Sequence, residues 1–104
     1  MAFELVRQAI TPIACWRDSV PPEARPPYAV VRLEEAEPLV GDDQAIRTLE
    51  RWSVWLVVAR DDEKKLRTME RSVLSVVPAV RTESGANAEL QWVKYVVKIP
   101  GDAT

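Results

Sequence analysis

The sequence contains no histidine and only one cysteine, Cys15, among its 104 residues. Without histidine the chain cannot build a Ser–His–Asp triad, a cysteine–histidine nucleophile or a zinc site with a histidine ligand. A single cysteine cannot form an internal disulfide, so a reducing compartment is the default expectation. We predict that Cys15 is a small buried apolar residue, that the chain is not an enzyme, and that it needs no cofactor or metal.

The sequence also lacks a long apolar run and a cluster of basic residues. Residues 1–10, MAFELVRQAI, include Glu4 and Arg7, so we expect neither a signal peptide nor a membrane span. A net charge of −2 with fourteen scattered basic residues argues against tight nucleic-acid binding, which requires Lys and Arg to neutralise phosphates. The apolar fraction of 47% and the charged fraction of 29% are typical of a globular protein, and the length predicts a single domain over residues 1–104.

Proline divides the first quarter of the chain. The spacing of apolar residues predicts a short amphipathic helix over residues 2–11, and Pro12 ends it because proline lacks a backbone N–H. A short strand over residues 13–17 is expected next. Residues 19–27, SVPPEARPP, contain four prolines and predict an ordered, extended loop. A proline-rich motif that docks into an aromatic groove is the less favoured alternative.

The remaining chain alternates strands with breakers and one helix. The predicted elements are a strand over 28–37, a loop over 38–46, a strand over 47–60, a helix over 62–77, a loop over 81–89, a strand over 90–99 and a frayed tail after residue 99. An extended run over 47–60 spans about 45 Å, which suggests a hairpin arm that projects from the body. The order α-β-β-β-α-β predicts an α+β fold, with a mostly antiparallel sheet of about four strands and two helices packed on one face.

Residues 52–59, WSVWLVVA, are apolar on both faces of the predicted strand. Trp52 and Trp55 are three positions apart, so a regular strand points them to opposite faces unless a bulge rotates one of them. Two helices on one face cannot cover both, and buried aromatic residues are favoured at subunit interfaces. The sequence leaves open which tryptophan faces a neighbouring chain. The candidate interface residues are Trp52, Trp55, Val57, Trp92 and Tyr95.

Acidic residues gather in two places. The first group is interpreted as a solvated loop or, alternatively, as a negative surface lining a channel that DNA passes without adhering; it comprises Glu34, Glu35, Glu37, Asp42 and Asp43. Residues 41–43, GDD, also match a metal-binding turn of RNA-dependent polymerases, but no partner motif is present and a surface turn is favoured. The second group, residues 61–63, is explained by capping of the following helix rather than by metal binding.

The order of these segments resembles the tail-terminator, or tail-completion, proteins of long-tailed bacteriophages and the related minor tail and head–tail joining proteins. The resemblance covers nearly the whole chain. It rests on the short N-terminal helix, the proline-rich entry into PPYAVVRLEEAE, the loop with GDD, the long strand ERWSVWLVVAR, the acidic-capped helix DDEKKLRTMERSVLSVV and the final strand. These motifs consist of apolar pattern and order, so no single position carries over as a functional residue.

The resemblance implies a structural virion-assembly protein that forms a homo-oligomeric ring, commonly a hexamer, which terminates the tail tube and provides the surface for head joining. The implied partners are other copies of the chain, the tail tube protein and head connector proteins, with no membrane. The implied location is the virion tail or neck, and the bacterial host cytoplasm during assembly. The alternative is a non-viral α+β ligand-binding or dimerisation module in which the two-faced strand forms the dimer seam.

Overall fold

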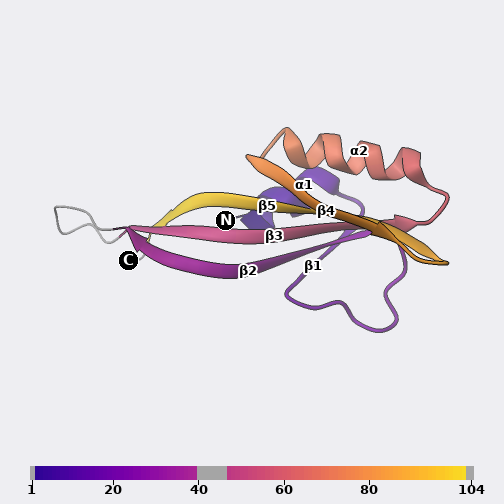
Figure 1. The fold of residues 1–104 in the computed structure, drawn as a ribbon, viewed down its shortest axis with the longest axis horizontal. Coiled ribbons are helices and arrows are strands. Elements are labelled where there is room, and N and C mark those ends of the chain that lie inside the picture. The colour runs from indigo at the N-terminus through magenta and orange to yellow at the C-terminus, as the bar shows by residue number, and fades with distance from the viewer. Residues whose placement is uncertain (1, 40–46, 103–104) are drawn as a thin grey trace.

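In the computed structural model, which describes residues 2–39 and 47–102, a five-stranded sheet carries two helices on one face (Figure 1). The elements are α1 (Ala2–Ile10), β1 (Ala14–Arg17), β2 (Tyr28–Leu39), β3 (Arg47–Ala59), α2 (Glu63–Leu74), β4 (Ala79–Ala86) and β5 (Leu90–Asp102). The strand order across the sheet is β1-β2-β3-β5-β4, with β1 parallel to β2 and the other pairs antiparallel. The predicted α+β class is confirmed, with five strands instead of about four.

Residues 79–86 form the additional strand, β4, so the prediction of a loop over residues 81–89 is wrong. Among the strands of residues 2–39 and 47–102, β4 lies at the edge of the sheet and pairs with β5 alone. Its side chains are almost all exposed, and even Val80 is 67% exposed, so no buried alternation marks the strand in the sequence. Its place is set by backbone pairing with β5, where Val80 lies opposite Val96.

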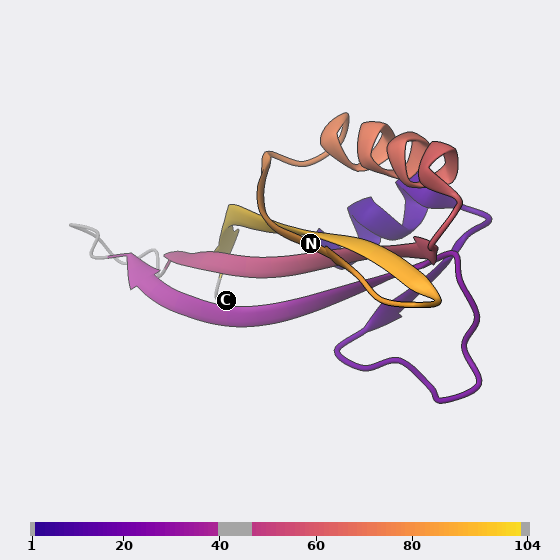
Figure 2. The same ribbon diagram turned by 45° about the vertical axis from the view of Figure 1, so that its right-hand side comes forward.

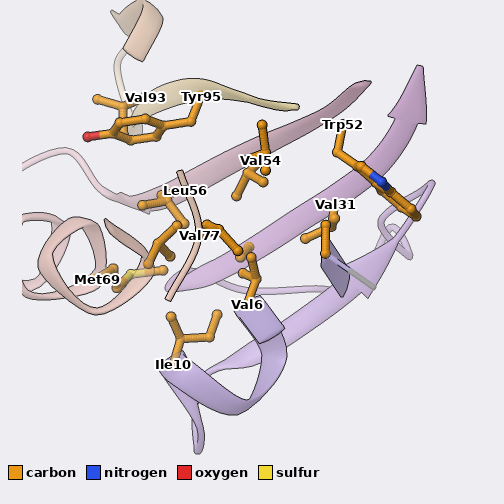
Figure 3. Close-up of a cluster of buried hydrophobic side chains, with 14 of the residues drawn as sticks. Val6, Ile10, Val31, Trp52, Val54, Leu56, Met69, Val77, Val93 and Tyr95 are labelled. Atoms are coloured by element: carbon orange, nitrogen blue, oxygen red, sulfur yellow. The ribbon is translucent and has the colours of Figure 1, made fainter. Parts of the chain in front are cut away.

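Both helices turn one apolar side toward the same face of the sheet (Figures 1 and 2). The buried helix residues are Ala2, Val6 and Ile10 of α1 and Leu66, Met69 and Val73 of α2. They pack in one core with alternate residues of the strands, among them Val31, Val54, Leu56 and Val93 (Figure 3). Burial of each of the valine, leucine, isoleucine and methionine side chains stabilises the fold by about 1.5–3 kcal/mol, so this core joins the two layers.

The second helix has defined ends. Asp62 is its N-cap, and its carboxylate accepts a hydrogen bond from the backbone N–H of Lys65 at 3.3 Å. The helix ends at Leu74, three residues before the predicted end. Val77 precedes Pro78, and the proline ring disfavours helical backbone geometry at the position before it. Val77 nevertheless remains buried in the core, which explains why the apolar stripe in the sequence extends past the helix.

The strands β2, β3 and β5 continue beyond the helices as a three-stranded arm, which extends to the left in Figure 1. We define the arm as residues 33–39, 47–51 and 98–102. The projecting arm predicted from the length of the third strand is therefore confirmed. Residues 100–102 belong to β5 because they pair with residues 47–49 of β3, so the prediction that the chain frays from residue 100 is wrong for them.

Candidate subunit interface

The sheet face opposite the two helices, called the open face below, carries two of the predicted interface tryptophans. Trp55 and Val57 point away from the helices, because the alternate positions of β3 lie in the core. Strand register places Val30 of β2 and Lys94 of β5 on either side of Trp55, and Trp92 beside Val57. Aromatic and aliphatic side chains thus form one continuous surface across three strands.

Trp52 and Tyr95 lie on the helix-covered face, so the prediction that they belong to a subunit interface is wrong. Trp52 is 1% exposed and Tyr95 is 4% exposed, and both belong to the core (Figure 3). The indole N–H of Trp52 donates to Glu50 at 3.0 Å, and the Tyr95 hydroxyl donates to Glu70 of α2 at 2.7 Å. A side chain enclosed by its own chain is not available to a neighbouring subunit.

The pKa of the Tyr95 hydroxyl is strongly raised. Burial disfavours the charged phenolate, and the hydrogen bond to the Glu70 carboxylate stabilises the protonated hydroxyl. Together these effects raise the pKa of Tyr95 to about 12. Tyr95 therefore links α2 to β5 as a neutral donor at any physiological pH.

Trp55 lies beneath a charged side chain. The Lys94 ammonium lies 5.1 Å from the centroid of the Trp55 ring, a cation–π arrangement, and 3.9 Å from the carboxylate of Glu83 on β4. Trp55 remains half-buried, since the lysine covers only part of the indole. Tryptophan is over-represented among the residues that dominate binding energy at interfaces. Trp55 and Lys94 together therefore offer a neighbouring subunit a large apolar surface with a positive charge at its edge.

Trp92 depends on the glycine that faces it. Gly85 of β4 pairs with Trp92, and a Cβ atom at Gly85 would lie 2.5 Å from Cζ2 and 2.8 Å from Cε2 of the indole. The absence of a side chain at Gly85 lets the Trp92 ring lie directly against the edge strand. No pattern in the sequence connected these two residues, because the prediction placed Gly85 in a loop.

Part of the open face is covered by the chain itself. Val30 is 9% exposed and Val57 is 8% exposed, although α1 and α2 lie on the other face of the sheet. A hollow of about 420 Å³ on this face is bounded on one side by residues 18–20 and on the other by Trp55 and Trp92. The loop that was predicted over residues 19–27 is present on this side of the sheet, and its first residues border the hollow (Figure 2).

A larger hollow of about 820 Å³ lies on the open face where the arm begins. Val80 and Val96 form its apolar part, and its polar lining includes Arg51, Lys94 and Lys98. Two of these cations have acidic neighbours, since Lys94 lies near Glu83 and the Arg51 guanidinium binds the Glu35 carboxylate at 2.9 Å. The hollow is therefore mixed in charge and apolar at one side.

Three of the predicted acidic residues, Glu34, Glu35 and Glu37, lie exposed on the arm. Glu35 is paired with Arg51, so the arm surface is less negative than the sequence suggests. A register shift between Leu33 and Glu35 places an irregularity at Glu34. Asp42 and Asp43 lie outside the described residues.

Two further features bear on chemistry. Cys15 is partly buried and packs against the core, and burial raises the pKa of its thiol to about 11, so it is a poor nucleophile at neutral pH. Within residues 2–39 and 47–102, no three Cys, Asp or Glu side chains come together as a metal site. As for membranes, no helix within the described residues is long and apolar enough to cross a bilayer.

Comparison of the sequence with models of known protein families and with curated proteins gives no match.

Proposed function

We propose that this chain is a structural subunit of a long-tailed phage or prophage, which assembles into a ring that terminates the tail tube and provides the head-joining surface. The observation that carries the proposal is the open face. Trp55 and Trp92 lie there with Val30 and Val57 on a sheet that a single chain covers with helices on only one side. A structural role in which copies of the chain cover one another accounts for this surface without a catalytic site.

The open face has the composition that subunit contacts use. Stable interfaces bury about 800 Å² on each partner, and a few aromatic or arginine side chains near the centre contribute most of the binding energy. Trp55 and Trp92 would be such central residues, with Lys94, Glu83 and Arg32 at the charged rim. A repeated head-to-tail contact generates a ring when the rotation between neighbours closes, and we propose a closed ring of six copies.

The arm would serve the contacts along the axis of the ring. Its strands extend past the core, so it can reach a tail tube protein or a head connector protein without disturbing the helices. Exposed carboxylates on the arm would weaken adhesion of DNA if this surface faces the channel, because like charges repel phosphates. In this proposal the subunit has no membrane partner and acts in the host cytoplasm and then in the virion.

Native mass spectrometry at micromolar concentration, alone and with tail tubes of the same phage, tests the proposal. We expect a closed multimer in solution or a multimer bound at tube ends. Trp55→Glu should abolish the multimer, whereas Lys64→Glu, an exposed change on the helix side, should leave it intact. A wild-type protein that stays monomeric and has no affinity for tubes would exclude this function.

The larger hollow favours a second candidate, a ligand-binding or dimerisation module outside a virus. Its volume of about 820 Å³ lies in the range of small-molecule sites, and Val80, Val96 and Lys98 offer mixed apolar and cationic contacts. A bound ligand would raise the melting temperature, because it stabilises the folded state only. A thermal-shift screen with anionic amphiphilic compounds distinguishes this candidate from an assembly protein, which should show no such rise.

A further inference from the structure

Residues 18–27, called the cover loop below, lie on the side of the sheet opposite the helices in both ribbon views (Figures 1 and 2). The loop connects β1 to β2 and borders the hollow of about 420 Å³ through Asp18, Ser19 and Val20. The opposite wall of that hollow includes Trp55 and Trp92. The loop therefore lies beside the same aromatic surface to which we assign subunit contact.

The chemistry of the cover loop suits this surface. Val20 and the prolines at positions 21, 26 and 27 are half-buried, whereas Glu23 is exposed. Proline rings and aromatic faces pack favourably, as in the recognition of proline-rich segments by aromatic grooves. Val30 is 9% exposed and Val57 is 8% exposed on this face, and both line the hollow that Val20 borders. Trp16 and Trp55 flank Val30 in register.

The cover loop is attached mainly at its first residues. The Asp18 N–H donates to the Val31 carbonyl at 3.0 Å, and the Ser19 N–H donates to the Arg17 carbonyl at 2.8 Å. Within residues 2–39 and 47–102, the hydrogen bond found for residues 20–27 is internal to the loop, from the Ala24 N–H to the Pro21 carbonyl at 3.0 Å. Among the described residues, no hydrogen bond is found between residues 20–27 and the sheet.

Two features mark the start of the cover loop and the strand before it. Asp18 has a φ of 68°, a left-handed conformation that aspartate adopts more readily than most residues with a side chain, at the point where the chain leaves β1. Trp16 lies opposite Val30 in register, and its indole N–H is buried without an acceptor among the described residues. A buried donor without a partner disfavours the state that contains it.

We propose that the cover loop is an intramolecular cover of the Trp55–Trp92 surface, and that a neighbouring copy displaces it when subunits assemble. This inference rests on the proposed function, because it assigns the displacing partner as a second copy of the chain. The cover would keep the subunit monomeric until its local concentration is raised. The apparent affinity between copies is then reduced by the fraction of molecules in which the surface is uncovered.

Val20→Ser tests the inference, because it weakens the apolar contact of the cover and leaves the core unchanged. Glu23→Gln, at an exposed position of the same loop, is the matched control. The first measurement is fluorescence of the dye ANS, which binds exposed apolar surface, at a protein concentration at which light scattering shows both proteins to be monomeric. The second is the protein concentration at half-assembly, measured by light scattering with and without tail tubes.

We expect Val20→Ser to raise ANS fluorescence about twofold or more and to lower the half-assembly concentration roughly threefold or more, while Glu23→Gln resembles the wild type. Unchanged ANS fluorescence in Val20→Ser would overturn the inference. So would brighter ANS fluorescence combined with an unchanged or higher half-assembly concentration. If neither protein assembles yet Val20→Ser binds more ANS, the covering of the surface is upheld and the proposed function fails.

Discussion

Trp52 and Trp55 lie three positions apart on β3 and point to opposite faces of the sheet. Trp52 is enclosed between the sheet and the N-terminal segment, where the Arg17 guanidinium lies 5.7 Å from its ring, whereas Trp55 is half-buried beneath Lys94 on the open face. One strand thus supplies a core tryptophan and a surface tryptophan with no bulge between them. The two residues should respond differently to substitution.

Substitution of these two tryptophans separates folding from assembly. Trp52→Ala should lower the free energy of unfolding by about 3–5 kcal/mol, because it leaves a cavity in the core. Trp55→Glu should lower it by clearly less, since the Trp55 indole lies partly exposed on the open face beside Lys94 and outside the core. The Trp55→Glu substitution should nevertheless abolish self-association. Urea unfolding and native mass spectrometry measure the two effects, and equal losses of stability would contradict the assignment of faces.

Tyr95→Phe tests the link between α2 and β5. Loss of the hydrogen bond to Glu70 should lower the free energy of unfolding by about 1–2 kcal/mol at pH 7. The wild type should also lose stability as the pH rises from about 10 to about 12, because the unfolded tyrosine ionises near 10 and the folded one only near 12. The difference between the two proteins, measured by urea unfolding, should therefore shrink over this range. A constant difference would argue against the raised pKa.

Gly85→Ala tests the contact between β4 and Trp92. The new methyl group would lie within 3 Å of the indole, so the ring must move away from the edge strand. We expect a loss of about 1–3 kcal/mol in unfolding free energy, typical of overpacking, and a shifted Trp92 indole signal in NMR spectra. Ser84→Ala, at the exposed neighbouring position, serves as the control. If Gly85→Ala left both stability and the indole signal unchanged, the close packing would be disproved.

Asp62→Ala tests the start of α2. The Asp62 carboxylate accepts the Lys65 N–H, so its removal should cost about 1 kcal/mol of stability. Asp61→Ala removes the same charge one residue earlier and should cost a few tenths of a kcal/mol through the helix dipole alone. Thermal unfolding compares the two variants. Equal effects would mean that charge, and not the capping hydrogen bond, stabilises the helix start.

The sequence predicted most elements because their apolar spacing reflects one buried side. The helices and the strand through Val31 were predictable in this way, whereas the strand through Leu56 was predicted from a continuous apolar run and the projecting arm from its length. The strand β4 was not predictable from the sequence, because an edge strand with exposed side chains carries no burial pattern. Its position is set by pairing with β5. The helix end was overestimated because Val77 stays in the core after the helix has stopped.

The candidate site was predicted in part. Alternation along β3 identified Trp55 and Val57 as a second apolar face, but it could not decide which of Trp52 and Trp55 the helices cover. That choice depends on where the helices pack, which is a tertiary property. The cover loop was recognised as ordered from its prolines, yet its position over the open face follows from the turn at Asp18 and not from composition.

Negative-stain electron microscopy of the purified protein, alone and mixed with tail tubes of the same phage, tests the central claim most directly. Wild-type protein should appear as rings with a central hole or as caps at tube ends, and Trp55→Glu should show neither while remaining folded by circular dichroism. Uniform particles of monomer size on the wild-type grids, together with bare tube ends, would contradict a ring-forming tail subunit.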